Sequence, residues 1–262
     1  MTDMPAVVDA AWVQDRLADP DLVLGDVRGP NAHTRGHIPG SIPLVLGSPM
    51  PLADPEAVAD FAREIGLRLR RHGITGEERL VLYDRGDGVG AMPALQLAEL
   101  AGHPRVAVLL GGLAGWPGEL EEGPTDLEPV KARLEPRPGA LPTHTELAGR
   151  LQDPQLTILD VRRSEEYSGR HGSPCDPRQG HIPGAKLVEY TTLFAGPGQP
   201  RSPEEIRSLV GVPEGAEIVA YCHSGSRSAL ATLALRSAGY RARNYAGSWH
   251  EWSRHAELPI ER

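Results

Sequence analysis

Residues 217–238 read EIVAYCHSGSRSALATLALRSA, which joins an apolar run, a small polar loop and a segment with helical spacing. The apolar run over 217–221 predicts a buried strand and residues 228–238 predict a helix, so Cys222 stands on a tight loop between them. In such a loop the backbone N–H groups converge on the cysteine sulfur, and with the helix N-terminus they favour its anionic, nucleophilic form. Arg227 adds a positive charge. A lone cysteine after a strand is more often a core residue, but the polar loop predicts that Cys222 is a reactive thiol.

Short apolar runs alternate with helical patterns along the whole chain. We expect strands over residues 22–27, 80–83, 106–110, 156–161, 186–188, 217–221 and 243–245. We expect helices over residues 9–18, 56–71, 92–101, 145–151, 203–210 and 228–238. This alternation is typical of a parallel α/β sheet covered on both faces. Ligands of such sheets bind beyond the carboxyl ends of the strands, where Cys222 lies.

Four short motifs occur twice in the chain and keep their order. They are GDVR (25–28) with LDVR (159–162), GHIPGS (36–41) with GHIPGA (180–185), LVLYD (80–84) with IVAYC (218–222), and GGLAGW (111–116) with GSWHEW (247–252). Collinear matches of this kind indicate that a whole domain is duplicated. We expect an N-terminal domain over 1–118, an extended linker rich in Pro, Gly and Glu over 119–142, and a C-terminal domain over 143–262.

Composition excludes several classes of partner. The chain has 262 residues, 40% of them hydrophobic, which is enough for two ordinary cores. A net charge of −8 without a Lys/Arg block argues against nucleic acid or an anionic membrane as partner. The sequence also lacks a basic start with an apolar core and any apolar run of about 18 residues, so we expect an unexported, cytoplasmic protein.

The chain has two cysteines, Cys175 and Cys222. Two are too few for a disulfide scaffold, and their surroundings in the sequence give no metal-type Cys/His pairing. We therefore expect a free working thiol, no metal and no cofactor. Residues 170–179 have no counterpart in the first copy, and we expect them to form a Pro-rich loop that hangs over the pocket. Within that loop Cys175 is by default a bystander, with a resolving thiol and a sulfur relay as alternatives.

The DVR, GHIPGA, YCxxGxRS and GSWxEW elements, doubled and in this order, resemble the two-domain rhodaneses, the thiosulfate and 3-mercaptopyruvate sulfurtransferases. The resemblance covers nearly the whole chain. It implies tandem rhodanese-like domains, each a parallel five-stranded sheet with helices on both faces, of which only the C-terminal one is catalytic. The residues independently support a single catalytic domain, because the first copy has Asp84 where the second has Cys222, and a carboxylate cannot form a persulfide.

The resemblance implies that sulfane sulfur moves from a small donor such as thiosulfate to cyanide or another thiophilic acceptor through a Cys222 persulfide. Four residues separate Cys222 from Arg227, one fewer than in related cysteine phosphatases, so the loop has space for one added sulfur rather than a phosphate. A cysteine phosphatase and a non-catalytic rhodanese binding module are therefore weaker alternatives. 3-Mercaptopyruvate stays open as the donor: the arginine expected before Gly169 is replaced by Ser168, but Arg170 lies two residues further on.

Supporting roles fall on the loop and on one arginine outside it. The resemblance assigns Arg162 to the anionic end of the donor, which suits the forked guanidinium, with an ion pair at the surface as the alternative. Arg227 either binds the donor anion or braces the loop. His223 and Ser224 stand where mammalian-type enzymes carry basic residues, and we expect them to contact the donor at the rim. The expected persulfide cradle consists of Gly225, Ser226 and Ser228, although a serine at a helix start also serves as an N-cap.

Overall fold

The computed structural model describes residues 4–47, 55–131, 134–196 and 198–262. The chain divides into two compact units, and each is described by itself. The first consists mainly of residues up to 48 and Val58–Ala140, and the second mainly of Leu141–Gly196 and Pro200–Arg262. Among the described residues, no helix has the length and apolar character needed to cross a membrane.

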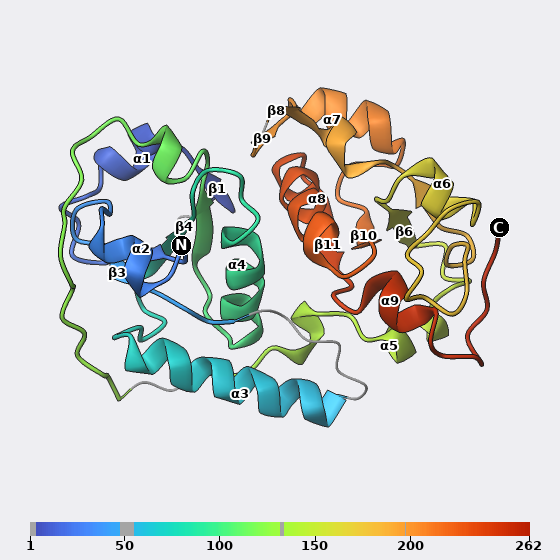
Figure 1. Ribbon diagram of the computed structural model, residues 1–262, viewed down its shortest axis with the longest axis horizontal. Coiled ribbons are helices and arrows are strands. Elements are labelled where there is room, and N and C mark those ends of the chain that lie inside the picture. Colours follow the sequence, from blue (N-terminus) through green and yellow to red (C-terminus); the bar gives the residue numbers. More distant parts are fainter. Residues whose placement is uncertain (1–3, 48–54, 132–133, 197) are drawn as a thin grey trace. The chain divides into compact units, whose positions relative to one another are not determined.

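The first unit contains a five-stranded parallel sheet (Figure 1). Its strands, in spatial order, are β1 (Val7–Val8), β5 (Val106–Leu109), β4 (Arg79–Tyr83), β2 (Leu22–Asp26) and β3 (Ile42–Pro43). Its α-helices are α1 (Ala10–Gln14), α2 (Pro30–Thr34), α3 (Pro55–Arg71) and α4 (Ala91–Leu100), with 3-10 turns η1 (Leu113–Gly115) and η2 (Pro138–Ala140). Residues of the expected linker run along this unit, since Glu121 exchanges backbone hydrogen bonds with His37 and Val130 donates one to Arg70.

The second unit repeats this plan around a four-stranded parallel sheet. Its strands, in spatial order, are β11 (Arg241–Asn244), β10 (Glu217–Tyr221), β6 (Leu156–Asp160) and β7 (Lys186–Leu187). Its α-helices are α5 (His144–Gly149), α6 (Ser164–Tyr167), α7 (Pro203–Val210), α8 (Ser226–Ser237) and α9 (Ser248–Trp252), with a 3-10 turn η3 (Tyr190–Leu193). Two short strands, β8 (Phe194–Gly196) and β9 (Gln199–Pro200), pair with each other.

Strand periodicity divides the second core into two layers. Successive side chains of a strand point to opposite faces, so Ile218 and Ala220 of β10 pack on one side with residues of α7 and α8. Val219 and Tyr221 pack on the other side with Trp249 and Trp252 of α9 and with α5. The sheet is thus buried on both faces, as the continuous apolar run over 217–221 predicts.

Several elements differ in their bounds from the expected ranges, and short elements that were not expected are present. Two of the differences concern the sheet of the second unit. The last strand spans Arg241–Asn244 instead of 243–245, because it pairs along β10 from Glu217↔Arg241 to Ala220↔Asn244. In addition, the first sheet has five strands but the second has four in the described part of the chain. Leu141 and Pro142 precede α5 as the strand Val7–Val8 precedes α1, and Pro142 has no N–H to donate to a neighbouring strand.

Candidate functional site

Cys222 follows β10 directly, and α8 begins four residues later at Ser226. Its side chain is buried, with 1% of the residue exposed. The backbone N–H of Gly225 donates a hydrogen bond to Sγ at 3.1 Å, and the Ser228 hydroxyl lies 3.4 Å from Sγ. Gly225 has φ +88°, and a Cβ there would lie 2.6 Å from the carbonyl oxygen of Ala246, so the turn that aims this N–H requires glycine. The loop therefore presents hydrogen-bond donors and a helix N-terminus to the sulfur.

The first copy shows what this loop does with an anion. Asp84 occupies the position of Cys222 after β4 and is almost fully buried. Its oxygens accept four backbone hydrogen bonds of 2.9–3.2 Å, from Gly86, Gly88, Gly90 and Ala91. A ring of amide dipoles stabilises negative charge. The first copy fills its cradle with its own carboxylate, whereas the second holds a sulfur there.

Ser248 is a site residue that the sequence analysis missed. Its Oγ accepts a hydrogen bond from the backbone N–H of Cys222 at 3.0 Å and donates one to the carbonyl oxygen of Tyr245 at 2.8 Å. Its φ is +54°, and among the described residues no other non-glycine residue has a positive φ. The matching position of the first copy, Gly112, has φ +47°. The repeated GGLAGW and GSWHEW motifs contain the signal, because aligning them places a serine on a glycine position.

A pocket of about 650 Å³ opens beside the Cys222 loop. His223 and Arg227 of the loop, Glu166 of α6 and residues 171–174 of the insert are among the residues that line it. The insert over 170–179 is thus part of the pocket wall.

Arg227 is tied to the pocket wall by an ion pair. Its guanidinium donates two hydrogen bonds to the Glu166 carboxylate, at 2.8 and 2.9 Å. These bonds raise the pKa of Arg227 above its ordinary value, and the charge of Cys222 contributes to the shift. Burial acts to raise the pKa of Glu166, but the hydrogen bonds from Arg227 and from the Arg163 backbone outweigh it and the pKa is lowered. Both partners stay charged, so Arg227 braces the loop while its exposed part faces the pocket.

Arg162 does not lie where the resemblance to the family suggested. It is 1% exposed and donates to Asp160 at 2.6–3.1 Å and to the carbonyl oxygen of Gly180 at 2.7 Å. Its guanidinium also lies 4.8 Å from the centre of a Trp249 ring. We therefore correct the expectation that Arg162 holds the donor. The alternative of an ion pair at the surface is corrected as well, because Arg162 pairs with Asp160, at the end of its strand, inside the core.

Arg28 supports this correction. In the first copy, which has no cysteine in its loop, Arg28 donates to both oxygens of Asp26 and to the carbonyl oxygen of Gly36. Equal contacts in a copy without the nucleophile indicate that the arginine cross-links the strand end to the GHIPG turn. Arg162 is part of the repeated scaffold.

The remaining loop residues divide between rim and cradle. Ser224 and Ser226 are exposed, whereas Ser228 is buried against the sulfur. His223 is partly exposed at the pocket, with Nε2 3.2 Å from Oδ2 of Asp176. Of the expected cradle, Gly225 and Ser228 contact Sγ. Ser226 starts α8.

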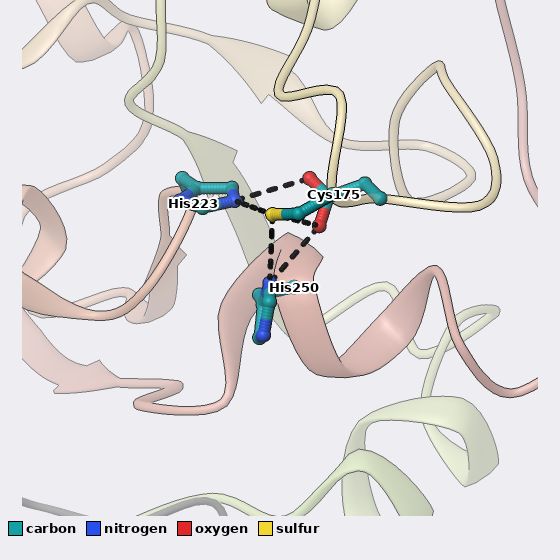
Figure 2. A group of neighbouring side chains, drawn as sticks. Cys175, His223 and His250 are labelled. Atoms are coloured by element: carbon teal, nitrogen blue, oxygen red, sulfur yellow. Dashed lines mark hydrogen bonds and ion pairs between the residues drawn. The ribbon is translucent and has the colours of Figure 1, made fainter.

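The expectation that no histidine pairs with a cysteine is wrong, because the fold brings two histidines close to Cys175. Figure 2 shows the Cys175 sulfur between His223 and His250, at 3.9 Å from Nε2 of the former and 3.7 Å from Nδ1 of the latter. These histidines are 48 and 75 residues away along the chain, so no local spacing reveals them. Cys175 is exposed, and neither it nor Cys222 forms a disulfide.

Comparisons with known proteins cover both copies. The family model of the rhodanese-like domain matches residues 9–119 and again residues 143–255. The chain is 32% identical to a probable 3-mercaptopyruvate sulfurtransferase of Pseudomonas aeruginosa, over 97% of this chain and 97% of that protein. It is also 32% identical to a thiosulfate sulfurtransferase of Azotobacter vinelandii, over 98% of this chain and 97% of that protein. A crystal structure of a probable thiosulfate sulfurtransferase superposes with a TM-score of 0.72 at 35% identity, covering 93% of this chain and 98% of that one.

Proposed function

The chain belongs to the rhodanese family and is a sulfurtransferase, and from this premise we propose that it moves sulfane sulfur from thiosulfate to cyanide or another thiophilic acceptor through a persulfide on Cys222. One observation carries the proposal. The Cys222 sulfur accepts the Gly225 N–H at the end of a parallel strand, beside a pocket whose wall includes Arg227. Asp84, at the same position of the first copy, cannot act as a sulfur nucleophile.

In the first half-reaction the Cys222 thiolate attacks the outer sulfur of thiosulfate. A new S–S bond forms, the sulfur–sulfonate bond breaks, and sulfite leaves with its electron pair. The guanidinium of Arg227 supplies positive charge at the pocket for the anionic donor, and His223 also lines the pocket, next to the exposed Ser224. We assign no general base to the reaction, since the Gly225 N–H and the N-terminus of α8 face the sulfur and favour its nucleophilic, anionic form.

In the second half-reaction the acceptor attacks the outer sulfur of the persulfide. Cyanide leaves as thiocyanate and the thiolate is restored, so the kinetics are of the ping-pong type. Between the two steps the Gly225 amide and the Ser228 hydroxyl stabilise the anionic persulfide. The amide cradle of Asp84 in the first copy supports this role, because the corresponding loop there directs backbone N–H groups at both carboxylate oxygens.

The position of Arg170 bears on the choice between thiosulfate and 3-mercaptopyruvate. A carboxylate donor calls for a second arginine in the pocket, and Arg170 was the candidate. Its Nε donates to Ser168 Oγ at 3.0 Å, and it is not among the described residues that line the pocket, although Arg163 is. 3-Mercaptopyruvate is the second candidate, since the relative from Pseudomonas aeruginosa is named for that donor.

Steady-state rates with the two donors, each with cyanide as acceptor, test this proposal. We expect the larger kcat/KM with thiosulfate. A larger value with 3-mercaptopyruvate would reverse the choice of donor, and no transfer from either would reject the proposed chemistry. A chromogenic phosphate ester, the substrate of the phosphatase alternative, is expected to remain uncleaved.

We also propose how the chain is organised around this chemistry. The domain over 143–262 is catalytic, the domain over 1–118 is not, and residues 119–142 link them. A working thiol that is free of disulfides favours a reducing compartment, and we propose the cytoplasm.

A further inference from the structure

Four side chains with metal-binding chemistry converge at the edge of the donor pocket. They are Cys175 and Asp176 of the insert, His223 of the catalytic loop and His250 of α9, here called the mouth cluster. One ligand atom from each lies within 4.8 Å of all the others. The side chains come from three separate segments, and Figure 2 shows Cys175, His223 and His250 directed toward one another.

The spacing of these atoms matches a tetrahedral ion. Metal–ligand bonds of about 2.3 Å to sulfur and about 2.0 Å to nitrogen or oxygen put neighbouring ligand atoms roughly 3.3–3.5 Å apart. In the mouth cluster the Cys175 sulfur is 3.9 Å and 3.7 Å from the two imidazole nitrogens. The Asp176 oxygens are 3.2 Å from His223 Nε2 and 3.0 Å from His250 Nδ1. The two sulfur–nitrogen distances exceed the tetrahedral spacing by a few tenths of an ångström, and all four ligand atoms lie within 4.8 Å of one another.

Asp176 supplies an independent observation that points to a ligand. Its side chain is 1% exposed, and Oδ2 accepts no hydrogen bond from the described residues. Oδ2 lies 3.2 Å from His223 Nε2, a contact that is an ion pair only when that imidazole is protonated. A buried polar atom without a partner is costly, and such atoms are rare in folded proteins. The other oxygen, Oδ1, lies 3.2 Å from the Arg254 guanidinium. Arg254 and His250, whose Nδ1 is 3.0 Å from Oδ1, thus orient the carboxylate so that Oδ2 faces the mouth cluster, as outer hydrogen bonds commonly do for metal ligands.

We propose that the mouth cluster binds one Zn²⁺ ion per chain through Cys175 Sγ, His223 Nε2, His250 Nδ1 and an oxygen of Asp176. A donor set of one thiolate, two imidazoles and one carboxylate suits zinc, whereas calcium and magnesium need more oxygen ligands. The Cys175 thiol loses its proton to solvent when the sulfur–zinc bond forms, and no electrons are transferred. The ion has a path from solvent, since Cys175 is exposed and the His250 side chain is 40% exposed.

The mouth cluster is specific to the catalytic copy. Arg85 stands at the position of His223 and Ala114 at that of His250, and the first copy has no counterpart of the insert. His223 also lines the donor pocket, as do Ser173 and Pro174 next to Cys175. A bound zinc ion therefore fixes the insert to the catalytic loop and holds the rim of the pocket in one arrangement.

Cobalt titration of the full-length, reduced protein tests the proposal. Co²⁺ replaces Zn²⁺ in tetrahedral sites and gives a thiolate-to-cobalt charge-transfer band that reports a sulfur ligand. We expect one Co²⁺ per chain, with a band that persists in Cys222→Ser, is lost in Cys175→Ser, and disappears when Zn²⁺ is added. The absence of the band from the wild-type protein would overturn the proposal. A band that disappears in Cys222→Ser but not in Cys175→Ser would also overturn it, by moving the ion to the catalytic thiol.

Two controls keep the test independent of folding and of activity. A second group of possible ligands, His144, Glu251 and His255, lies in the same unit, so His255→Ala should bind cobalt like the wild type, whereas His250→Ala should not. An ion that binds only the folded state raises the unfolding temperature, so Zn²⁺ should raise that of the wild-type protein and of His255→Ala. In Cys175→Ser, which loses only an exposed thiol, the unfolding temperature should be normal without zinc and unchanged by it. A zinc-induced rise that survives in Cys175→Ser would reject the mouth cluster.

Discussion

At the scale of single residues, Ser248 carries a side chain in a backbone conformation that costs free energy. A non-glycine residue at φ +54° pays on the order of 1 kcal/mol or more, and the first copy avoids this cost with Gly112 at φ +47°. The serine is retained where its Oγ accepts the Cys222 N–H. Strain at this position therefore coincides with a contact to the nucleophile, which indicates that the hydroxyl fixes the backbone of the reactive residue.

Replacing Ser248 by glycine should separate stability from activity. We expect Ser248→Gly to unfold at the same or a higher temperature, because the strain is relieved. We expect its kcat/KM for thiosulfate to fall by about two- to tenfold, the equivalent of one neutral hydrogen bond. Ser248→Ala, which keeps the strain and loses the hydroxyl, should lose both stability and rate. Unchanged rates in both variants would remove Ser248 from the site.

At the scale of elements, the arginine after a strand joins that strand to the turn that follows. Arg162 links the end of β6 to Gly180, and Arg28 links the end of β2 to Gly36, through Asp160 and Asp26 respectively. Both aspartates and Arg162 are buried and Arg28 is partly buried, so removal of an arginine leaves a buried carboxylate without compensation.

Arg162→Ala should therefore act on stability. We expect it to destabilise the fold by about 3–5 kcal/mol, measured by denaturant unfolding, with a smaller loss for Arg28→Ala because Arg28 is the more exposed of the two. At temperatures where the variants stay folded, the KM for thiosulfate should be unchanged in both. A raised KM in Arg162→Ala alone, with normal stability, would restore the donor-binding role.

A second element-level contact predicts how stability depends on pH. Glu217 at the start of β10 accepts hydrogen bonds from Arg150, beyond α5, and from Arg243 of β11. These bonds, that of Arg150 first and against the opposing effect of burial, lower the pKa of Glu217 from 4.5 to about 2. A depressed pKa in the folded state stabilises the protein above the unfolded value and loses that effect as the pH falls toward the folded value.

Glu217→Gln tests this linkage. We expect the variant to be less stable than the wild type at neutral pH. The difference in stability, measured by thermal unfolding at each pH, should shrink below pH 4.5 and vanish near pH 2. Glu204→Gln removes an exposed carboxylate that is paired with Arg207 and serves as the control. Its stability should depend on pH as that of the wild type does. A difference between Glu217→Gln and the wild type that stays constant down to pH 2 would contradict the assignment.

At the scale of the whole molecule, the two copies share a backbone plan but differ in what fills the loop. The loop after β4 encloses the Asp84 carboxylate, and the loop after β10 encloses the Cys222 sulfur. Thiosulfate should therefore load one sulfur per chain. Intact mass after donor treatment, followed by peptide mapping, should place that sulfur on Cys222, and a label on Cys175 would move the active site.

Two substitutions follow from the same asymmetry. Cys222→Ser should abolish sulfur transfer. Asp84→Ala should leave transfer largely intact while it lowers thermal stability, because four backbone N–H groups lose their acceptor. Substantial turnover by Cys222→Ser would reject the division of roles between the copies.

The sequence by itself determined the features that are written locally. Hydrophobic periodicity and the loop around Cys222 predicted the strand, the turn and the helix. The repeated motifs predicted two α/β domains of the rhodanese family. The fifth strand expected in the second domain is not present among the described residues. Only the tertiary structure decided which side chains meet. Arg162 reaches Gly180 across 18 residues, the Cys222 amide reaches Ser248 across 26, and Cys175 reaches His250 across 75. The physical reason is that a strand or a turn depends on neighbours in the chain, whereas a contact between distant segments depends on how the sheet and its loops pack.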